Sequence, residues 1–135
     1  MSVYADMVSK KKKVLFGDDT IVIRHINSSI TGGRTLDVSC FTDSVIKAGH
    51  IVVRKKDSDG AYIYSPLGVK NGAYVALPDG AEYVGVVINS MPSDEPVVGI
   101  MDDGRVNDVA MPYPITDDMR KALKTALPNL IFEHD

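Results

Sequence analysis

Three Asp-Gly pairs follow residue 45 and separate short runs that are rich in β-branched residues. Asp-Gly readily adopts the positive φ angles of tight hairpin turns, and the runs recur at intervals of roughly ten residues, as in all-β domains. We therefore expect antiparallel hairpins with turns at Asp59-Gly60, Asp79-Gly80 and Asp103-Gly104. The predicted strands are His50–Lys55, Ala61–Ser65, Tyr83–Asn89, Pro96–Met101 and Arg105–Ala110.

One helix is predicted near the end of the sequence. Thr116 can cap its N-terminus, acidic residues follow in the first turn, and apolar residues from Met119 to Leu127 recur at helical spacing. Pro128 ends the helix, and Leu130–Phe132 has the composition of a short terminal strand. The predicted fold class is mainly β: a small antiparallel β-barrel or sandwich with one C-terminal α-helix.

The first 40 residues differ in character from the rest. Lys10–Lys13 leads into a hairpin predicted from Val14–Phe16 and Thr20–Ile23. After the Gly32-Gly33 turn, alternation of apolar and polar residues from Leu36 to Cys40 predicts a strand with one buried face, and the lone Cys40 thiol is expected inside. We divide the chain into an N-terminal basic segment and hairpin, 1–40, and a β-rich core, 41–135, within one compact domain.

Catalytic motifs are weak in this sequence. The adjacent acidic pairs lie where turns and a helix start are expected, and Asp57-Ser58-Asp59-Gly60 lacks the later ligands of a calcium loop. We expect no catalytic residue, no metal site, no cofactor and no enzymatic activity. A small hydrolase that uses His25 or His50 with Cys40 stays open as an alternative, as does a β-barrel module that binds a glycan or small ligand through its dispersed tyrosines.

Charge and hydropathy point away from nucleic acid and membranes. The formal net charge is −3, and no tryptophan or basic aromatic stripe is present, so a nucleic-acid partner is not expected. Apolar runs such as Val86–Ile88 fall well short of the ~20 residues of a membrane span. The N-terminus lacks the pattern of a secretory signal, so we expect synthesis and retention in a cytoplasm.

An ordered set of motifs covers about Ile46 to Phe132. It comprises Ile46-Lys47-Ala48-Gly49-His50-Ile51-Val52, an Asp-Gly hairpin with Tyr62-Ile63-Tyr64, Tyr83-Val84-Gly85-Val86-Val87, Pro96–Met101, Asp103–Asn107, Ala110-Met111-Pro112, the helix, and Ala126–Phe132. In this order the motifs resemble the head decoration proteins of tailed phages, both the lambda type and the related bases of phage head fibres. Residues 1–40 depart from the flexible arm that is typical of the lambda type.

The resemblance implies a structural protein of a phage or prophage virion. Such a protein is a homotrimer on the outer surface of the head, where it contacts the major capsid protein and stabilises the shell. Since the matched core accounts for the fold, we expect the segment outside it to reach the capsid, with contacts from Lys10, Lys11, Lys12, Lys13 and Phe16. For the lysines, a solvated tail and a nucleic-acid contact stay open as alternatives.

Overall fold

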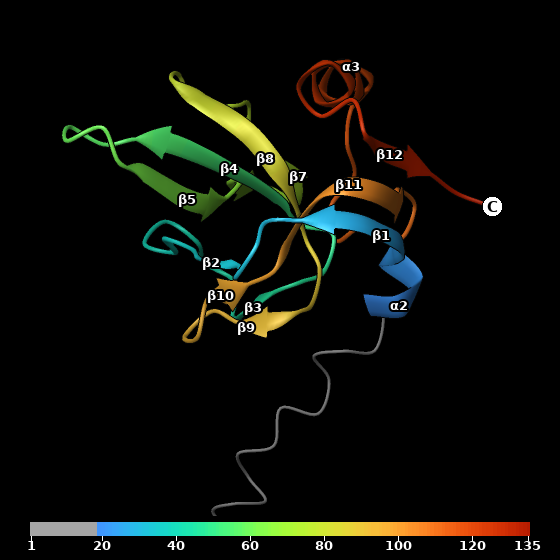
Figure 1. Cartoon of the computed structure of the whole chain (residues 1–135), viewed down its shortest axis with the longest axis horizontal. Coiled ribbons are helices and arrows are strands. Elements are labelled where there is room, and N and C mark those ends of the chain that lie inside the picture. The colour runs from blue at the N-terminus through green and yellow to red at the C-terminus, as the bar shows by residue number, and fades with distance from the viewer. Residues whose placement is uncertain (1–18) are drawn as a thin grey trace, which may run out of the picture.

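The computed structural model describes residues 19–135, which form an open, mainly antiparallel sheet (Figure 1). Its strands are ordered β1-β11-β8-β4-β5, and β12 pairs with β11 in parallel. Since β1 and β5 lie at opposite ends of this path and do not pair, the sheet is not a closed barrel. The strands are β1 (Ile23–Ser29), β4 (Ile51–Lys56), β5 (Tyr62–Pro66), β8 (Ala81–Val87), β11 (Ile100–Asn107) and β12 (Leu130–Glu133).

Smaller elements lie on either side of this sheet. Helix α3 (Asp117–Ala126) lies on one side, and two pairs of two-residue strands lie on the other (Figure 1). The short pairs are β2 (Arg34–Thr35) with β10 (Val97–Val98), β3 (Val45–Ile46) with β9 (Met91–Pro92), and a separate β6 (Val69–Lys70) with β7 (Ala73–Tyr74). The predicted mainly β fold with a C-terminal helix is confirmed.

The central sheet separates two apolar clusters. The helix-side core consists of Val22, Ile51, Val53, Leu67, Val86, Met101, Val106, Met111, Leu123 and Leu130. The small-sheet core consists of Leu36, Ile46, Val52, Val84, Val87, Val98 and Ile100. Neighbours in sequence, such as Val86 and Val87, enter opposite cores because successive side chains of a strand point to opposite faces. This sandwich of sheet, helix and small sheets explains why the central strands are continuous apolar runs.

The predicted turn at Asp59-Gly60 is confirmed and joins β4 to β5. The Asp57 Oδ1 atom accepts hydrogen bonds from the backbone N–H groups of Asp59 and Ala61, and Gly60 has a φ of 84°. A turn also forms at Asp79-Gly80, directly before β8, but the hairpin predicted there is wrong, because β8 pairs with β4 and β11 and the preceding β7 pairs with β6. Both are local structures, and Asp-Gly meets their need for a positive φ.

The turn predicted at Asp103-Gly104 is wrong, because β11 continues through both residues. The strands predicted at Pro96–Met101 and Arg105–Ala110 therefore join into β11, with β10 before it and a turn after Asn107. Glycine serves a different purpose here: a Cβ on Gly104 would stand 2.3 Å from the backbone oxygen of His25 in β1. It permits a close approach of two strands, which local sequence does not reveal.

The helix prediction is confirmed in detail. The Thr116 hydroxyl accepts a hydrogen bond from the backbone N–H of Met119 at 3.2 Å, and the acidic first turn suits the positive end of the helix dipole. Leu123 is fully buried in the helix-side core. The helix ends at Ala126, before Pro128, and the predicted terminal strand is β12.

The hairpin arm predicted at Thr20–Ile23 is wrong for its first three residues. Helix α2 (Asp19–Val22) occupies this segment, while the other arm lies outside the described residues. The buried Asp19 carboxylate explains the difference, because it accepts hydrogen bonds from the backbone N–H of Ser90 at 2.8 Å and from the Ser90 hydroxyl at 2.6 Å. These long-range bonds anchor the turn of helix and direct Val22 into the core.

The strand predicted from Leu36 to Cys40 does not form beyond β2. The Asp37 side chain accepts a hydrogen bond from the backbone N–H of Ser39, and the chain then turns so that the Phe41 N–H donates to the Val38 carbonyl. Leu36 is buried as expected, but Cys40 is exposed. An Asx turn two residues after β2 thus overrides the alternating pattern.

Candidate functional site

The predicted capsid contact lies outside the described residues. Lys10, Lys11, Lys12, Lys13 and Phe16 all precede Asp19, the first residue that the structure describes. Their role therefore stays a prediction. The described residues 19–135 carry other surfaces, and the most distinctive lies on β4 and the edge strand β5.

A Tyr–Arg surface covers one face of the β4–β5 hairpin. In the antiparallel register Arg54 stands opposite Tyr64, and Lys56 stands opposite Tyr62, so all four side chains share a face. The neighbouring strand β8 adds Glu82, which pairs with Arg54. We use this name for Arg34, Arg54, Lys56, Tyr62, Tyr64 and Glu82.

Cations and aromatic rings alternate on this surface. The Arg54 guanidinium carbon lies 4.0 Å from the ring centroid of Tyr62, and its Nη1 donates to the Tyr64 hydroxyl at 3.3 Å. This hydrogen bond from Arg54 lowers the pKa of Tyr64, aided by Arg34 and opposed by partial burial. Lys56 lies over the Tyr62 ring as well, at 5.4 Å. Such stacking restrains long cationic side chains and presents them in fixed positions.

Arg34 belongs to β2, outside the β4–β5 hairpin. It follows the Gly32-Gly33 turn, and its Nη1 donates to the carbonyls of Gly33 at 2.6 Å and Thr31 at 3.2 Å. Its guanidinium carbon lies 5.4 Å from the Tyr64 ring centroid. The backbone keeps this segment against β5, because the Asp37 N–H donates to the Tyr64 carbonyl at 2.7 Å.

Between the Arg34 segment and the first residues of β5 lies a shallow groove of about 470 Å³. We call it the Arg34 groove; its lining residues are Arg34, Thr35, Leu36, Asp37, Tyr62, Ile63 and Tyr64. Tyr62 and Ile63 are 42% and 43% exposed, so their apolar surface is available to a ligand. From sequence alone, Arg34 belongs to a predicted turn and the tyrosines are dispersed. The signal in the sequence that could have found this face is the i, i+2 spacing of Tyr62 and Tyr64 in a strand.

The histidines and the cysteine do not form a catalytic arrangement in the described structure. His50 is buried, its Nε2 bonds to the Leu67 carbonyl at 2.9 Å, and the rings of Phe41, Tyr74 and Tyr113 surround it. Burial lowers the pKa of His50, although the Leu67 carbonyl opposes this shift. His25 is exposed on β1, and among residues 19–135 no hydrogen bond joins the Cys40 thiol to either imidazole. Among residues 19–135, the Cys40 thiol is therefore not paired with a histidine that could act as its general base, as the hydrolase hypothesis requires.

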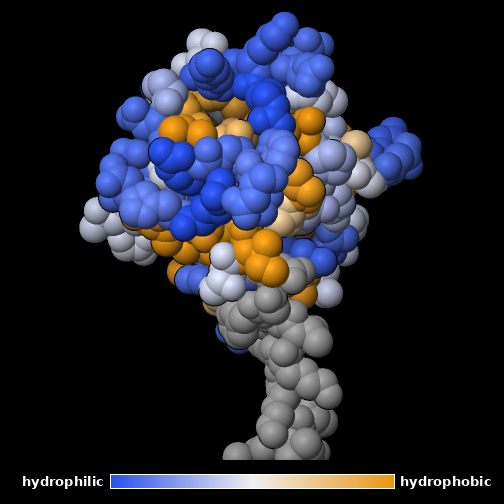
Figure 2. Space-filling view, turned by 90° about the vertical axis from the view of Figure 1, so that its right-hand side faces the viewer, coloured by the Kyte–Doolittle hydropathy of each residue, from blue (hydrophilic) through white to orange (hydrophobic). Residues whose placement is uncertain are grey.

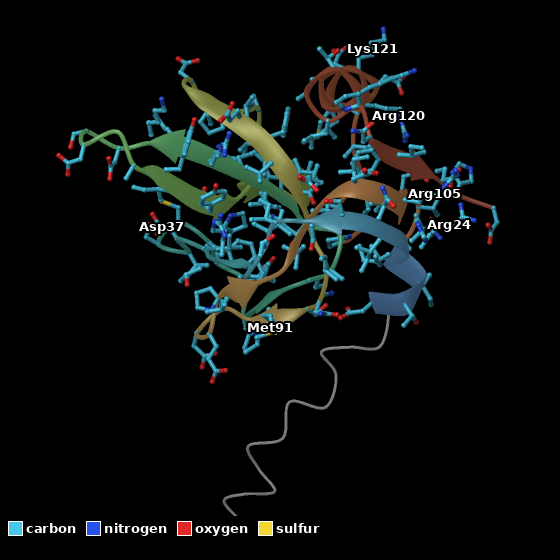
Figure 3. The ribbon with its side chains drawn as sticks, viewed as in Figure 1. Arg24, Asp37, Met91, Arg105, Arg120 and Lys121 are labelled. Carbon is cyan, nitrogen blue, oxygen red and sulfur yellow. The ribbon has the colours of Figure 1, made fainter. Side chains whose placement is uncertain are left out.

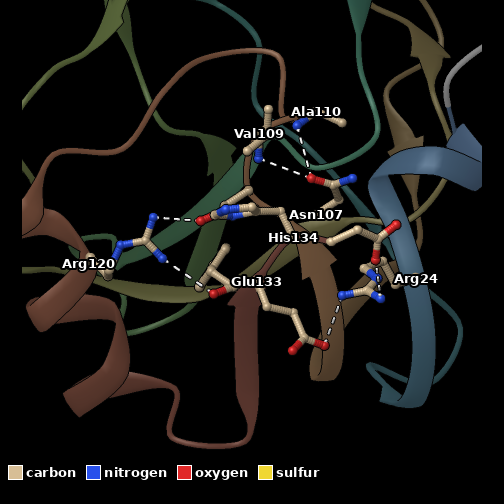
Figure 4. Close-up of polar contacts among 10 residues, drawn as sticks. Arg24, Asn107, Val109, Ala110, Arg120, Glu133 and His134 are labelled. Carbon is tan, nitrogen blue, oxygen red and sulfur yellow. Dashed lines mark hydrogen bonds and ion pairs between the residues drawn. The ribbon is translucent and has the colours of Figure 1, made fainter.

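A C-terminal ionic network ties β12 to the rest of the molecule (Figures 3 and 4). Arg24 of β1 pairs with Glu133 at 3.2 Å, and Arg105 of β11 pairs with the same carboxylate at 2.6 Å. Figure 2 shows that hydrophilic side chains cover most of this side of the molecule. The network consists of Arg24, Arg105, Asp108, Arg120, Glu133, His134 and Asp135.

Asp108 is the centre of the second half of this network. Its carboxylate accepts from Arg120 at 2.7 Å and bonds to His134 at 2.8 Å. Burial raises the pKa of Asp108, but the two hydrogen bonds and charges outweigh it, so the net shift is downward. The same bond holds His134, the penultimate residue, against Asp108. The charges of the network are matched within the protein, so the network has a structural role.

Neither a metal site nor a membrane-spanning helix is found in the part of the chain that the structure describes. No three His, Cys, Asp or Glu side chains of residues 19–135 gather closely enough to hold a metal ion. In the acidic run Asp57-Ser58-Asp59, the Asp57 carboxylate accepts backbone hydrogen bonds within its own turn. No described helix is both long and apolar enough to cross a bilayer.

A second concavity, of about 380 Å³, lies between α3 and the segment from Ala73 to Leu77. Met119 and Ala122 line it from the helix, and Tyr83 lines it from β8. Among the described residues on its wall, the one charged side chain is Asp118, which belongs to the first turn of α3. The lining of this concavity offers few polar groups that could orient a ligand. The Arg34 groove, which has both a cation and a carboxylate on its walls, is the stronger candidate site.

Comparisons with known proteins gave no matching family model, no matching curated protein and no matching solved structure. Functional inference for this chain therefore rests on its own residues, on the described geometry and on the order of its motifs. Of these, the motif order addresses the class of protein, and the geometry addresses what its surface can bind.

Proposed function

We propose that this protein decorates and stabilises the outer surface of a tailed-phage or prophage head, as a homotrimer that binds the major capsid protein. The observation that carries the proposal is the order of motifs from Ile46 to Phe132, which resembles that of head decoration proteins and head-fibre bases. The motifs correspond to successive elements of the fold: the Gly49 turn before β4, the hairpin to β5, then β8, β11, α3 and β12. The motifs thus cover the central sheet except β1, together with its helix.

The physical requirements of such a role fit a small β-rich module. Decoration needs many copies of a modest interface, because symmetry multiplies weak contacts into a stable attachment. It also needs a fold that stays rigid under load. Here long-range strand pairing and two apolar cores hold the sheet together, and the C-terminal ionic network ties β1, β11 and β12 at one end of it. Neither requirement involves bound cofactors or reacting side chains.

The test is binding to purified heads. Full-length protein is mixed with expanded heads and with unexpanded precursors, both of the phage or prophage whose capsid gene neighbours this gene, and the mixtures are sedimented. We expect saturable binding to expanded heads and a trimer in multi-angle light scattering. A strict monomer at high concentration, together with no co-sedimentation on expanded heads, would contradict the proposal.

A further inference from the structure

Arg34 differs from the other arginines of residues 19–135 in its charge balance. Five arginines lie in this range, and four of them form ion pairs with carboxylates: Arg24, Arg54, Arg105 and Arg120. Within the described residues Arg34 has no carboxylate partner within ion-pair distance; its hydrogen bonds go to backbone carbonyls. Within residues 19–135 it is thus a positive charge that is held in place without an ion-pair partner.

The position of Arg34 is held from several sides. Its Nη1 is fixed by the carbonyls of Thr31 and Gly33, and the Tyr64 ring lies alongside its guanidinium. Gly33 cannot be replaced freely, because a Cβ there would stand 2.6 Å from the Val98 oxygen. Since both carbonyl bonds use Nη1 and a guanidinium has five N–H groups, donors remain for an external acceptor. A carboxylate can occupy two of them at once.

The other walls of the Arg34 groove supply complementary chemistry. Arg54 and Lys56 lie over the Tyr62 ring, yet Tyr62 is still 42% exposed, and this remaining aromatic surface is where a C–H face of a sugar ring can pack. The exposed Asp37 carboxylate is kept ionised, because hydrogen bonds from Ser39, the backbone N–H first, lower its pKa. An ionised Asp37 accepts hydrogen bonds and donates none, so it favours a ligand with hydroxyl groups.

We propose that the Arg34 groove binds an acidic saccharide, with the ligand carboxylate on Arg34, its hydroxyls toward Asp37, and a ring face on Tyr62. An acidic peptide suits the groove less well, because it has few hydroxyls to donate to the Asp37 carboxylate. A neutral saccharide would leave the charge of Arg34 uncompensated. The inference goes beyond head decoration and does not depend on it, since the groove belongs to the isolated chain.

The experiment is a calorimetric or NMR titration of the full-length protein with defined probes. Three acidic oligosaccharides are used: oligogalacturonate, a sialyl-oligosaccharide and a hyaluronan fragment. A neutral oligosaccharide of equal length and a short polyglutamate peptide are the comparison probes. The variants are Arg34→Ala and Tyr62→Ala, each checked for folding by circular dichroism. Arg105→Ala is the matched control, because it removes one positive charge on the opposite side of the molecule from Asp37 (Figure 3).

We expect saturable binding of at least one acidic oligosaccharide and much weaker binding of the neutral probe and of polyglutamate. Loss of a charge-assisted bond predicts affinity reduced about tenfold in Arg34→Ala, and Tyr62→Ala should weaken binding several-fold, on the order of the loss of one stacked ring. Arg105→Ala should bind as the wild type does.

Three outcomes would overturn the inference. The first is no saturable binding of any acidic probe by the wild type. The second is an equal loss of affinity in Arg34→Ala and Arg105→Ala, which would indicate attraction by overall charge. The third is polyglutamate binding as tightly as the saccharides, which would identify a general anion or peptide site. None of these measurements involves heads, so their failure and a failure to decorate heads are separate results.

Discussion

Replacing Gly104 by alanine tests the close contact between β1 and β11. A Cβ at this position would stand 2.3 Å from the His25 backbone oxygen and 2.6 Å from the Met101 sulfur. The oxygen belongs to the neighbouring strand, so relief requires that β1 move away from β11. Gly60 is the matched control, because it has a positive φ of 84° in a hairpin turn and a Cβ added there would meet no atom within 4 Å.

The two substitutions should differ clearly in magnitude. Gly60→Ala forces a residue with a side chain into the left-handed region, which costs about 1 kcal/mol. Gly104→Ala carries a comparable backbone penalty and adds overpacking of roughly 1–3 kcal/mol, because β1 and Met101 must shift. We therefore expect the free energy of unfolding to fall by about 3 kcal/mol for Gly104→Ala and by about 1 kcal/mol for Gly60→Ala.

Urea denaturation followed by circular dichroism measures both values, and amide hydrogen exchange locates the damage. Exchange in Gly104→Ala should accelerate in β1 (Ile23–Ser29) before it does in β4. If the two variants lose equal stability and β1 stays protected, Gly104 occupies an ordinary turn. That result would refute the continuous β11 strand and restore the hairpin that the Asp103-Gly104 pair predicts.

Three further predictions concern titration, ion pairing and the capsid. Burial lowers the pKa of His50 below its ordinary 6.5, so the unfolded chain binds that proton first as the pH falls through 6.5. In urea titrations the free energy of unfolding should be lower at about pH 5.5 than at about pH 7.5. His50→Gln should reduce this difference between the two pH values, and an unchanged difference contradicts the prediction. In thermal melts at neutral pH, Arg120→Ala should destabilise more than Arg105→Ala, because it removes bonds to the nearly buried Asp108 and to a backbone carbonyl; the reverse order would count against this placement. Deleting Met1–Lys13 should weaken co-sedimentation with expanded heads, and unchanged binding would rule out the N-terminal capsid contact.

Local chemistry explains why much of the fold was predictable from sequence. The Asp59-Gly60 turn depends on an Asx bond and one positive φ, and both requirements lie within five residues. The helix after Thr116 likewise depends on its own cap and on a stripe that ends at Pro128. Such elements form wherever their short sequence occurs, so pattern and spacing suffice.

The errors at Thr20–Val22 and Asp103-Gly104 arose where distant segments decide the local structure. Thr20–Val22 has β-branched residues, yet Ser90 holds Asp19 and a helical turn results. Gly104 follows an aspartate as a turn glycine does, but its role is set by the close approach of His25 in β1, which lies far earlier in the sequence. A single sequence does not contain these contacts in any local pattern.

The candidate site divides along the same line. The shared face of Tyr62 and Tyr64 follows from the alternation of a strand, and their partners Arg54 and Lys56 follow from counting across the hairpin. Arg34 could not be foreseen, because the bond between Asp37 and the Tyr64 carbonyl brings it to β5 from outside the hairpin. The feature that makes the groove suited to an anion is therefore the one that only the structure supplies.

The two apolar cores have a consequence for how faithfully the chain folds. When both faces of a strand are buried, slipping by one residue replaces one apolar side chain by another, so hydrophobicity penalises the error only weakly. Val84–Val87 and Ile100–Met101 are in this situation. Gly85 supplies the missing discrimination, since a Cβ there would stand 2.2 Å from the Met101 oxygen and only glycine permits the native fit. A slipped β8 would place a valine against that oxygen, and the clash would exclude this register. Steric exclusion therefore selects the native pairing of strands whose register burial alone does not fix.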